Sequence, residues 1–531
     1  MALRPKKKKG KTTNTGSERM KKLFLMMTIF FTYSLAPAQA NELCLGKEIG
    51  DHAILQNGRI KPLYVHAGEL IKYITGKSKI SDYSALEAYC RLSLSSLFPT
   101  LEMKVFPLIE HVKIKEILEL EDNKQISAKE IDENYRSDLL LAMRKEVEGS
   151  SLQKSIRRLL STINIIKDIR AGTNWVIPTQ EMSSIDDFTP INTLFSALDP
   201  SQMALSSELI SKEINARATQ YTKTFGQETH HKLEYSYAKL RLPVIALILT
   251  CLAIASFVLF RNFNITIIFS ALTLLVQFAY IIVRIIISGR APITNMYETV
   301  LFSGFASLFF TMIIGHFKKE PMFVKIGLGH NLLSIFMINF SGGMLSASIG
   351  PLVPVLRDNF WLSTHVTSII ASYGALALSW VLANSLLIRN KVRPLSSKEI
   401  RYQASIMYTC LKYGIVLLSA GIILGGVWAD YSWGRFWGWD PKETWSLIVL
   451  CIYMIILHGR YTNWITERRF IPFTAVAFLS VMMAWFGVNY ILAAGLHSYG
   501  FSEGGAIFLG SFFAIQIAII ALTTPKILKE N

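Results

Sequence analysis

Two histidines and a tryptophan-rich connector are the residues of this chain best suited to bind a flat ligand that carries a metal. His365 occurs in "NFWLSTHVTSIIASYG" and His497 in "NYILAAGLHSYG", and the connector between them contains "WGRFWGWDPKETW". An imidazole nitrogen is a common metal ligand. Indole rings offer large apolar faces, and glycines between them let a flat molecule approach the backbone. These residue types together indicate a site for a planar, apolar, metal-containing molecule.

Haem has the properties that such a site would match. Its porphyrin is a flat apolar disc with two carboxylates, and its iron accepts axial ligands such as histidine. His365 and His497 could bind the iron, because they lie on opposite sides of the connector in the sequence. The residues that could cover the disc or meet its carboxylates lie within the connector: Trp433, Trp437, Trp439, Arg435 and Lys442.

The same connector also has a structural interpretation. Tryptophans gather at the water interfaces of most membrane proteins. Asp440, Pro441 and Glu443 have the spacing of an N-cap, a first helical residue and the third residue of a capping box. Asp440 therefore has two open roles, the start of a helix or part of a ligand site, and the spacing favours the first. A belt of tryptophans at the membrane interface does not require the glycine between Trp437 and Trp439, whereas a flat ligand that approaches the backbone would favour it.

The composition places these residues in a membrane protein. Of 531 residues, 51% are hydrophobic and only 18% are charged, below the roughly 25% of ordinary soluble domains. The net charge is +17, and nine basic residues lie between Arg4 and Lys22. Much of the remaining positive charge lies between apolar runs, which is typical of charge that sets membrane topology. This distribution argues against a nucleic-acid-binding face.

We divide the chain into three predicted parts. Residues 1–40 contain a basic tail, an apolar run and the sequence "AQA", which is the pattern of a signal peptide cleaved after Ala40, and an uncleaved anchor stays open. Residues 41–242 have a soluble composition with helical periodicity, so we expect an extracytoplasmic, mostly helical domain. Residues 243–531 are expected to form a polytopic membrane domain, with the tryptophan-rich loop at 428–445.

Nine apolar runs in the last part predict the fold class. Most have about the 20 residues that a helix needs to cross a membrane, and only helices satisfy their backbone groups in lipid. The chain is therefore expected to be mainly α, a polytopic membrane helix bundle after an exported helical domain. The expected spans are 243–260, 265–287, 298–315, 323–345, 366–388, 409–427, 445–459, 470–492 and 504–524.

The connectors between these runs predict the orientation. If residues 41–242 are exported, the connectors on the cytoplasmic side hold thirteen Lys and Arg, and those on the outer side hold four. Cytoplasmic loops carry an excess of Lys and Arg. The count therefore agrees with export of 41–242, and it places the tryptophan-rich loop, His365 and His497 on the outer side.

The other histidines and cysteines give weaker signals. His66 and the pair His230–His231 are expected to be surface residues rather than ligands. Cys44 and Cys90 could form a disulfide in an exported segment, although nothing in the sequence requires it. None of the five cysteines forms a CxxC pair, so a zinc knuckle or a redox dithiol is not supported.

The connector resembles the WWD signature of haem-handling proteins. In detail it is similar to the CcsA-type subunit of the cytochrome c synthase of system II cytochrome c biogenesis. Four further segments carry the resemblance: "PITNMYETVLF" (292–302), "STHVTSIIASYGAL" (363–376), "ILHGR" (456–460) and "GLHSYG" (495–500). The resemblance covers about 265–500. "NGRIKPL" and the helix after it resemble the extracytoplasmic segment that precedes this module in some longer fused proteins.

The resemblance implies a function in cytochrome c maturation. Haem b would be transported or captured, held on the outer face by His365 and His497 beside the WWD loop, and presented to the CxxCH segment of apocytochrome c. His458 in "ILHGR" matches a histidine proposed to hold haem within the membrane. Its other interpretation is an interfacial residue. The second intramembrane ligand would come from a partner, with His330 as a substitute within this chain.

The resemblance also implies partners and a location. We expect a ResB/CcsB-like membrane subunit, apocytochrome c and thiol-reducing proteins as partners, no nucleic acid, and a place in the bacterial cytoplasmic membrane. Cytochrome c synthase activity, of the haem lyase type, is expected only together with the ResB-like subunit, and no catalytic residue is identified. Two other classes stay open: a secondary transporter, for which intramembrane charges such as Arg284 are few, and a membrane redox subunit with permanent haem.

Overall fold

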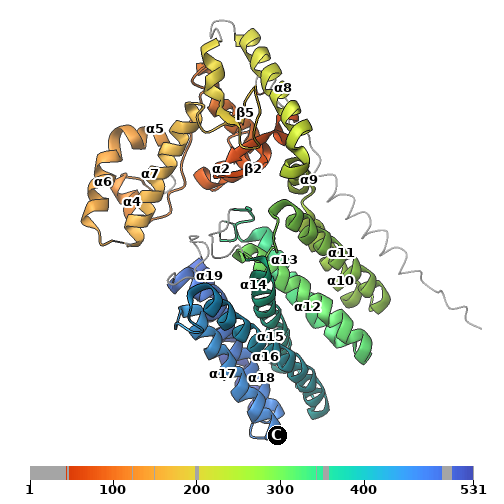
Figure 1. Cartoon of the computed structure of the whole chain (residues 1–531). Helices are drawn as coiled ribbons and strands as arrows, with labels where there is room; N and C mark the ends of the chain where they lie inside the picture. Colours follow the sequence, from red (N-terminus) through yellow and green to blue (C-terminus); the bar gives the residue numbers. More distant parts are fainter. Residues whose placement is uncertain are drawn as a thin grey trace, which may run out of the picture.

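The computed structural model describes residues 44, 47–121, 124–148, 150–197, 203–342, 344–350, 358–492 and 505–529. The predicted signal segment 1–40 lies outside these ranges. The described chain forms an N-terminal region, which ends with α9 (His231–Leu240), and a bundle of long helices that begins with α10 (Leu242–Val258) (Figure 1).

The N-terminal region combines helices with three small antiparallel sheets of two strands each. Its strands are β1 (Ala53–Gln56), β2 (Arg59–Pro62), β3 (Lys79–Ile80), β4 (Tyr83–Ser84), β5 (Val176–Pro178) and β6 (Phe188–Pro190). Its α-helices are α2 (Leu63–Thr75), α3 (Ala85–Leu94), α4 (Val112–Ile117), α5 (Ala128–Glu130), α6 (Arg136–Lys145), α7 (Ser151–Arg170), α8 (Met203–Thr229) and α9. Shorter 3₁₀ or π-helical turns are η2 (Lys47–Asp51), η3 (Pro99–Leu101), η4 (Ile131–Tyr135) and η5 (Ile191–Ala197).

The first hairpin includes the start of the segment "NGRIKPL", before the helix that the sequence analysis expected. β1 pairs with β2 from Ala53 opposite Pro62 to Gln56 opposite Arg59. Asn57 and Gly58 form the connection, with φ of 50° and 71°. A two-residue turn with two positive φ angles is the hairpin turn that favours Asn-Gly. The predicted amphipathic helix then follows as α2.

The expectation that His66 lies at the surface is wrong. His66 is 2% exposed and faces the core from α2. Its Nε2 lies 3.2 Å from the hydroxyl of Tyr89 and 3.1 Å from Oδ1 of Asn174. Burial, with the nearby charge of Lys61, lowers the pKa of His66 to about 3, so the imidazole is neutral at ordinary pH. His231 is also fully buried.

A disulfide fastens the start of the described chain to α3. Cys44 and Cys90 are bonded, with a Cα–Cα distance of 5.9 Å, and both side chains are buried. The pairing that the sequence left open is therefore present. Cys410 is buried as a free thiol in the bundle, where it packs as a small apolar side chain.

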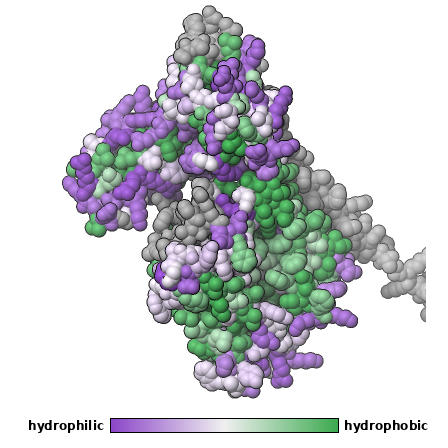
Figure 2. Space-filling model, viewed as in Figure 1, coloured by the Kyte–Doolittle hydropathy of each residue, from purple (hydrophilic) through white to green (hydrophobic). Residues whose placement is uncertain are grey.

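The bundle contains nine helices, among the described residues, that are long and apolar enough to cross a membrane. They are α9 continued into α10, α11 (Phe263–Ser288), α12 (Met296–Lys318), α13 (Pro321–Phe340), α14 (Asn359–Trp361) continued through η7 (Leu362–Val366) into α15 (Thr367–Val392), α16 (Ser397–Trp433), α17 (Pro441–Tyr461), α18 (Glu467–Met482) continued by η8 (Met483–Leu492), and α19 (Gly505–Lys529). Figure 2 shows a hydrophobic surface around the middle of the bundle, with hydrophilic residues at its lower end and over the N-terminal region.

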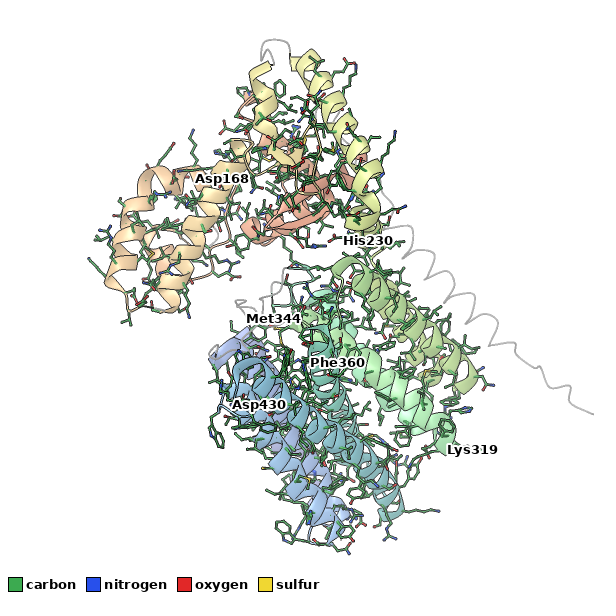
Figure 3. All side chains as sticks on the ribbon, viewed as in Figure 1. Asp168, His230, Lys319, Met344, Phe360 and Asp430 are labelled. Atoms are coloured by element: carbon green, nitrogen blue, oxygen red, sulfur yellow. A yellow bond between two sulfur atoms is a disulfide. The ribbon has the colours of Figure 1, made fainter. Side chains whose placement is uncertain are left out.

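The expected spans are confirmed in number and order, and the helices extend beyond several of them. The sixth begins at residue 397 rather than 409, because the side chain of Ser396 accepts the N–H of Glu399 and caps the helix early. The fifth begins at residue 359 rather than 366. Figure 3 places Phe360, Met344 and Asp430 at the end of the bundle nearest the N-terminal region, and Lys319 at the opposite end.

Arg59 joins the N-terminal region to this end of the bundle. Its guanidinium forms an ion pair with Glu234 of α9 and donates to the carbonyl of Ile349 at 2.9 Å. Arg290 donates to the next carbonyl, that of Gly350, at 2.7 Å. The 344–350 segment is therefore held between the first hairpin and the bundle.

Candidate functional site

A mostly apolar pocket opens at the end of the bundle that lies nearest the N-terminal region. It has about 1070 Å³ of empty space, including its solvent-filled mouth. Its walls come from the start of α12, from η7 and α15, from the last third of α16, from the tryptophan-rich loop, from the start of α17 and from η8. Segments that are far apart in the sequence thus meet around one cavity, which is the usual form of a ligand site.

His365 lies in the wall of this pocket with its tautomer fixed. It belongs to the π-helical turn η7, and its Nδ1 lies 2.8 Å from the carbonyl oxygen of Gly421 in α16. A carbonyl only accepts, so Nδ1 carries a proton, and in the neutral imidazole the lone pair is then on Nε2. That tautomer is the one in which Nε2 can bind a metal. The predicted ligand His365 therefore lies in the pocket wall, with Nδ1 bonded to the carbonyl of Gly421.

Glycines of α16 bring this helix close to the ring of His365. A Cβ atom on Gly425 would lie 2.6 Å from Cε1 of His365, and one on Gly426 would lie 2.5 Å from the ring of Phe436. These distances are below any real Cβ contact. The sequence analysis did not identify Gly421, Gly425 and Gly426, although their grouping in "SAGIILGGVW" marks a helix face that another group approaches.

The tryptophan-rich loop is a short connection between two well-capped helices. α16 ends at Trp433, and Gly434 follows with φ +67° and an N–H bonded to the carbonyl of Asp430. The side chain of Asp440 accepts the N–H of Lys442 at 2.9 Å and forms the predicted capping box with Glu443. The predicted role of Asp440 as an N-cap is therefore confirmed.

The loop divides its tryptophans between the pocket and the surface. Trp437 is half-buried and lines the pocket. Trp439 has φ +56°, is 69% exposed and contacts Trp437 edge to face. Trp433 is half-buried at the end of α16, outside the pocket lining. Of the three tryptophans predicted in the site, the structure places only Trp437 on the pocket wall.

The two cations of the loop also differ in position. Lys442 lines the pocket from the first turn of α17. Arg435 folds back over the loop and occupies the space beside Gly438. A Cβ on Gly438 would lie 0.8 Å from Nη1 of its guanidinium. Arg435 is outside the pocket lining.

The other predicted histidines do not join His365 in the described residues. His497 lies outside them. His458 is exposed in the last turn of α17. It lies about 18 Å along the helix axis from Ser446, which lines the pocket, at 1.5 Å per residue. His330 is buried in α13, with Nδ1 2.7 Å from Oγ of Ser307.

Trp428 is a pocket residue that the sequence analysis missed. It is 4% exposed in α16, and its ring lies 5.9 Å from that of His365 at 62°. It is the first residue of the predicted loop 428–445, but α16 continues through it to Trp433, and no role was predicted for it.

An ion pair buried in the bundle supports another wall of the pocket. Arg284 of α11 and Glu298 of α12 are both 1% exposed and 2.7 Å apart. The second carboxylate oxygen of Glu298 accepts from the N–H and the hydroxyl of Thr294, each at 2.7 Å. Thr294 lines the pocket. The intramembrane charge of Arg284 is thus paired, and its partner positions the segment that leads into α12.

Comparisons with known proteins identify relatives of the bundle. A family model described as cytochrome C assembly protein matches residues 293–497, a range that includes every residue of the pocket lining. The cytochrome c biogenesis protein CcsA of Guillardia theta is 33% identical over 243 residues, which are 41% of this chain and 79% of that protein. CcsA of Prochlorococcus marinus (strain MIT 9215) is 32% identical over 263 residues, 44% of this chain and 84% of that protein.

A longer relative matches over the same part of this chain. Protein NrfI of Wolinella succinogenes is 36% identical over 225 residues, which are 41% of this chain. This chain spans only 24% of the length of NrfI. The similarity therefore concerns one part of that protein.

Proposed function

The chain belongs to the cytochrome c assembly protein family, and from that premise we propose that it holds haem b in the pocket beside His365 and presents it to apocytochrome c. It is a multi-pass cytochrome c biogenesis protein of the CcsA type. The position of His365 in the pocket is the observation that carries the proposal.

The residues of the pocket fit haem as cargo. Nε2 of His365 would bind the iron, since Nδ1 is held by the carbonyl of Gly421. Trp437 and Trp428 would cover the porphyrin with apolar area. Lys442 is a cation on the same wall for a carboxylate of haem. Arg435 would meet a carboxylate of haem from the loop, outside the pocket lining. We keep His497 as the second axial ligand in this proposal.

The attachment reaction needs few groups from this chain. Each cysteine thiol of the CxxCH segment adds to one haem vinyl group, so a carbon–sulfur bond forms and the thiol hydrogen goes to the other vinyl carbon. No oxidant is consumed, but the thiols must be reduced, which is the role we give to thiol-reducing partners. The histidine of the same segment then replaces one protein ligand on the iron. The chain contributes orientation and exclusion of water.

We propose that the pocket lies on the outer face of a bacterial cytoplasmic membrane. The disulfide between Cys44 and Cys90 favours an oxidising compartment for the N-terminal region. The connectors on the side opposite the pocket carry the excess of Lys and Arg, as cytoplasmic connectors do. Haem would enter past His458 at the opposite end, with a ResB/CcsB-like subunit supplying the second ligand there.

The test of this function is purification with and without a ResB-like subunit, followed by an absorption spectrum. We expect a haem Soret band, and transfer of that haem to an added apocytochrome c with reduced thiols. Haem that cannot be extracted or transferred would favour a redox subunit. No haem in either preparation would favour a transporter and contradict the proposal.

Trp437 and Trp439 form a matched pair for a first variant test. Trp437→Ala should lower haem retention about tenfold, because it removes an aromatic wall of the pocket. Trp439→Ala should leave retention unchanged, since this side chain is 69% exposed outside the pocket. Both variants are compared by Soret absorbance per protein at equal membrane content. Equal losses in the two variants, or loss of both proteins from the membrane, would contradict a pocket role for Trp437.

Gly425→Ala should weaken haem binding about tenfold, the lower end of effects from groups that orient a metal ligand. The new methyl group would lie 2.6 Å from the ring of His365 and displace its imidazole. Gly510→Ala in α19 is the control, because a Cβ there meets nothing within 4 Å. Alanine is the better helix former at both sites, so helix propensity cannot explain a loss. The Soret maximum should shift in Gly425→Ala alone, and an unchanged spectrum would contradict the argument.

A further inference from the structure

We propose that the N-terminal region fixes the shape of the pocket, and that Arg59 is the positioning residue through which it does so. Arg59 lies in the first hairpin. It holds the connector between α13 and α14, and that connector holds two walls of the pocket. The inference gives a role to the N-terminal region, which lies outside the range 293–497 matched by the family model. It rests on the proposed function only for the nature of the ligand, which is haem.

The connector residues 344–350 give backbone carbonyls to side chains from other elements. This segment forms no helix or strand, and irregular backbone still needs partners for its polar groups. Arg59 of β2 donates to the carbonyl of Ile349 at 2.9 Å. Arg290 donates to the carbonyl of Gly350 at 2.7 Å. The connector is therefore fastened by the N-terminal region on one side and by the bundle on the other.

The same connector contacts two walls of the pocket. Asn295 lines the pocket and donates from Nδ2 to the carbonyl of Ser348 at 3.3 Å, while its Oδ1 caps α12 by accepting the N–H of Glu298. Tyr490 donates to the carbonyl of Met344 at 2.8 Å, and it belongs to η8, which forms another pocket wall. A displacement of the connector would therefore reach the start of α12 and η8 directly.

A second link from the N-terminal region ends at the same wall. Tyr237 of α9 accepts from Nη1 of Arg284 at 3.1 Å and stacks on Tyr280, with ring centroids 4.7 Å apart. Arg284 pairs with Glu298, whose carboxylate accepts the N–H of Thr294 on the pocket wall. Two routes thus lead from the N-terminal region to the start of α12.

The burial of these contacts makes the coupling effective. The side chain of Arg59 is 17% exposed, and that of its ion-pair partner Glu234 is 4% exposed. Met344 and Leu345 of the connector are buried in the core of the bundle. Close-packed side chains and hydrogen bonds carry coupling between distant sites. A change in the hold of Arg59 should therefore appear at the pocket wall.

The test is amide hydrogen exchange of haem-free, full-length protein in lipid nanodiscs. The double variant Arg59→Met/Glu234→Gln removes the donor to Ile349 without leaving a buried carboxylate unpaired. We expect the amides of 294–299 to exchange at least about tenfold faster, the effect of one hydrogen bond from a charged donor. The amides of α7, within the N-terminal region, should exchange as in wild-type protein.

The matched control is Lys61→Met/Glu69→Gln. Lys61 lies on the same strand as Arg59 and pairs with Glu69 at 2.7 Å, and no hydrogen bond joins this pair to the bundle among the described residues. Tyr237→Phe tests the second route, because it removes the acceptor of Arg284 and keeps the ring. It should also speed exchange at 294–299, and it decides the matter if α7 exchanges faster in the double variant.

Haem titrated into the same proteins, and followed by the Soret band, connects the wall to the ligand. The double variant and Tyr237→Phe should bind haem roughly 2- to 30-fold more weakly, the range for residues that couple distant sites. The control should match wild-type protein.

Three results would overturn the inference: unchanged exchange at 294–299 in both variants, equal acceleration in the control, or wild-type haem affinity in variants whose 294–299 segment exchanges faster. Faster exchange at 294–299 in a protein that binds no haem even as wild type would support positioning by Arg59 and contradict the proposed function. The failure of one is thus distinguished from the failure of the other.

Discussion

Replacing His365 with alanine is expected to remove most of the bound haem and to reduce cytochrome c maturation at least tenfold. The reason is the geometry of a single imidazole. The carbonyl of Gly421 holds Nδ1 at 2.8 Å, which leaves Nε2 as the metal-binding nitrogen in a pocket walled by tryptophans. Even the partners that orient a metal ligand typically contribute 10- to 100-fold, so loss of the ligand itself should cost no less.

The measurement is the Soret absorbance of protein purified from equal amounts of membrane, with covalent cytochrome c assayed in the same cells. His316→Ala is the control, because His316 is an exposed histidine in the last turn of α12, near Lys319 at the opposite end of the bundle. His316→Ala should match wild-type protein in both assays. Wild-type haem content and maturation in His365→Ala would contradict the assignment.

Glu298→Ala is expected to destabilise the bundle by about 3–5 kcal/mol, the usual cost of removing one partner of a buried ion pair. Both Glu298 and its partner Arg284 are 1% exposed, so the remaining guanidinium would be buried without its counter-charge. Thr294 would also lose the carboxylate that accepts both its N–H and its hydroxyl. We therefore expect little protein in the membrane and an early transition in thermal unfolding.

An apolar replacement of the whole pair separates charge burial from a specific need for these residues. The double variant Arg284→Met/Glu298→Leu should recover much of the stability, because buried pairs can often be replaced by apolar side chains. Glu399→Ala is the exposed control, since its pair with Arg389 is 48% and 35% exposed; such pairs contribute about 0–1 kcal/mol. A Glu298→Ala protein as stable as wild type would contradict the role of this pair.

The number and order of the membrane helices could be predicted from patterns that are local in the sequence. Apolar runs of sufficient length predicted all nine helices, because lipid leaves a spanning segment few other structures. The spacing of Asp440 and Glu443 predicted the start of α17, because a capping box depends only on neighbouring residues. The resemblance to CcsA-type proteins, carried by a few short motifs, led to the family to which the chain belongs.

Most residues that line the pocket could not be predicted from the sequence, because the pocket forms where distant segments of the chain meet. Gly425 looks like an ordinary residue of an apolar run, and Trp428 falls in the predicted loop with no predicted role. Only the approach of η7 to α16 brings both residues to the ring of His365. Trp439 looked like Trp437 in sequence, but a positive φ turns the two indoles to different sides of the loop. The first hairpin was missed for a different reason. Asn57–Gly58 is a local turn signal, but the strands on either side have only four residues each, so the sequence analysis did not predict them.

The most direct test of the pocket is a cryo-electron microscopy structure of the protein purified with its haem. We predict planar density between Trp428 and Trp437, with its centre within bonding distance of Nε2 of His365. Planar density at His458 only, or an empty pocket in a preparation that shows a Soret band, would contradict the proposal that this pocket holds haem.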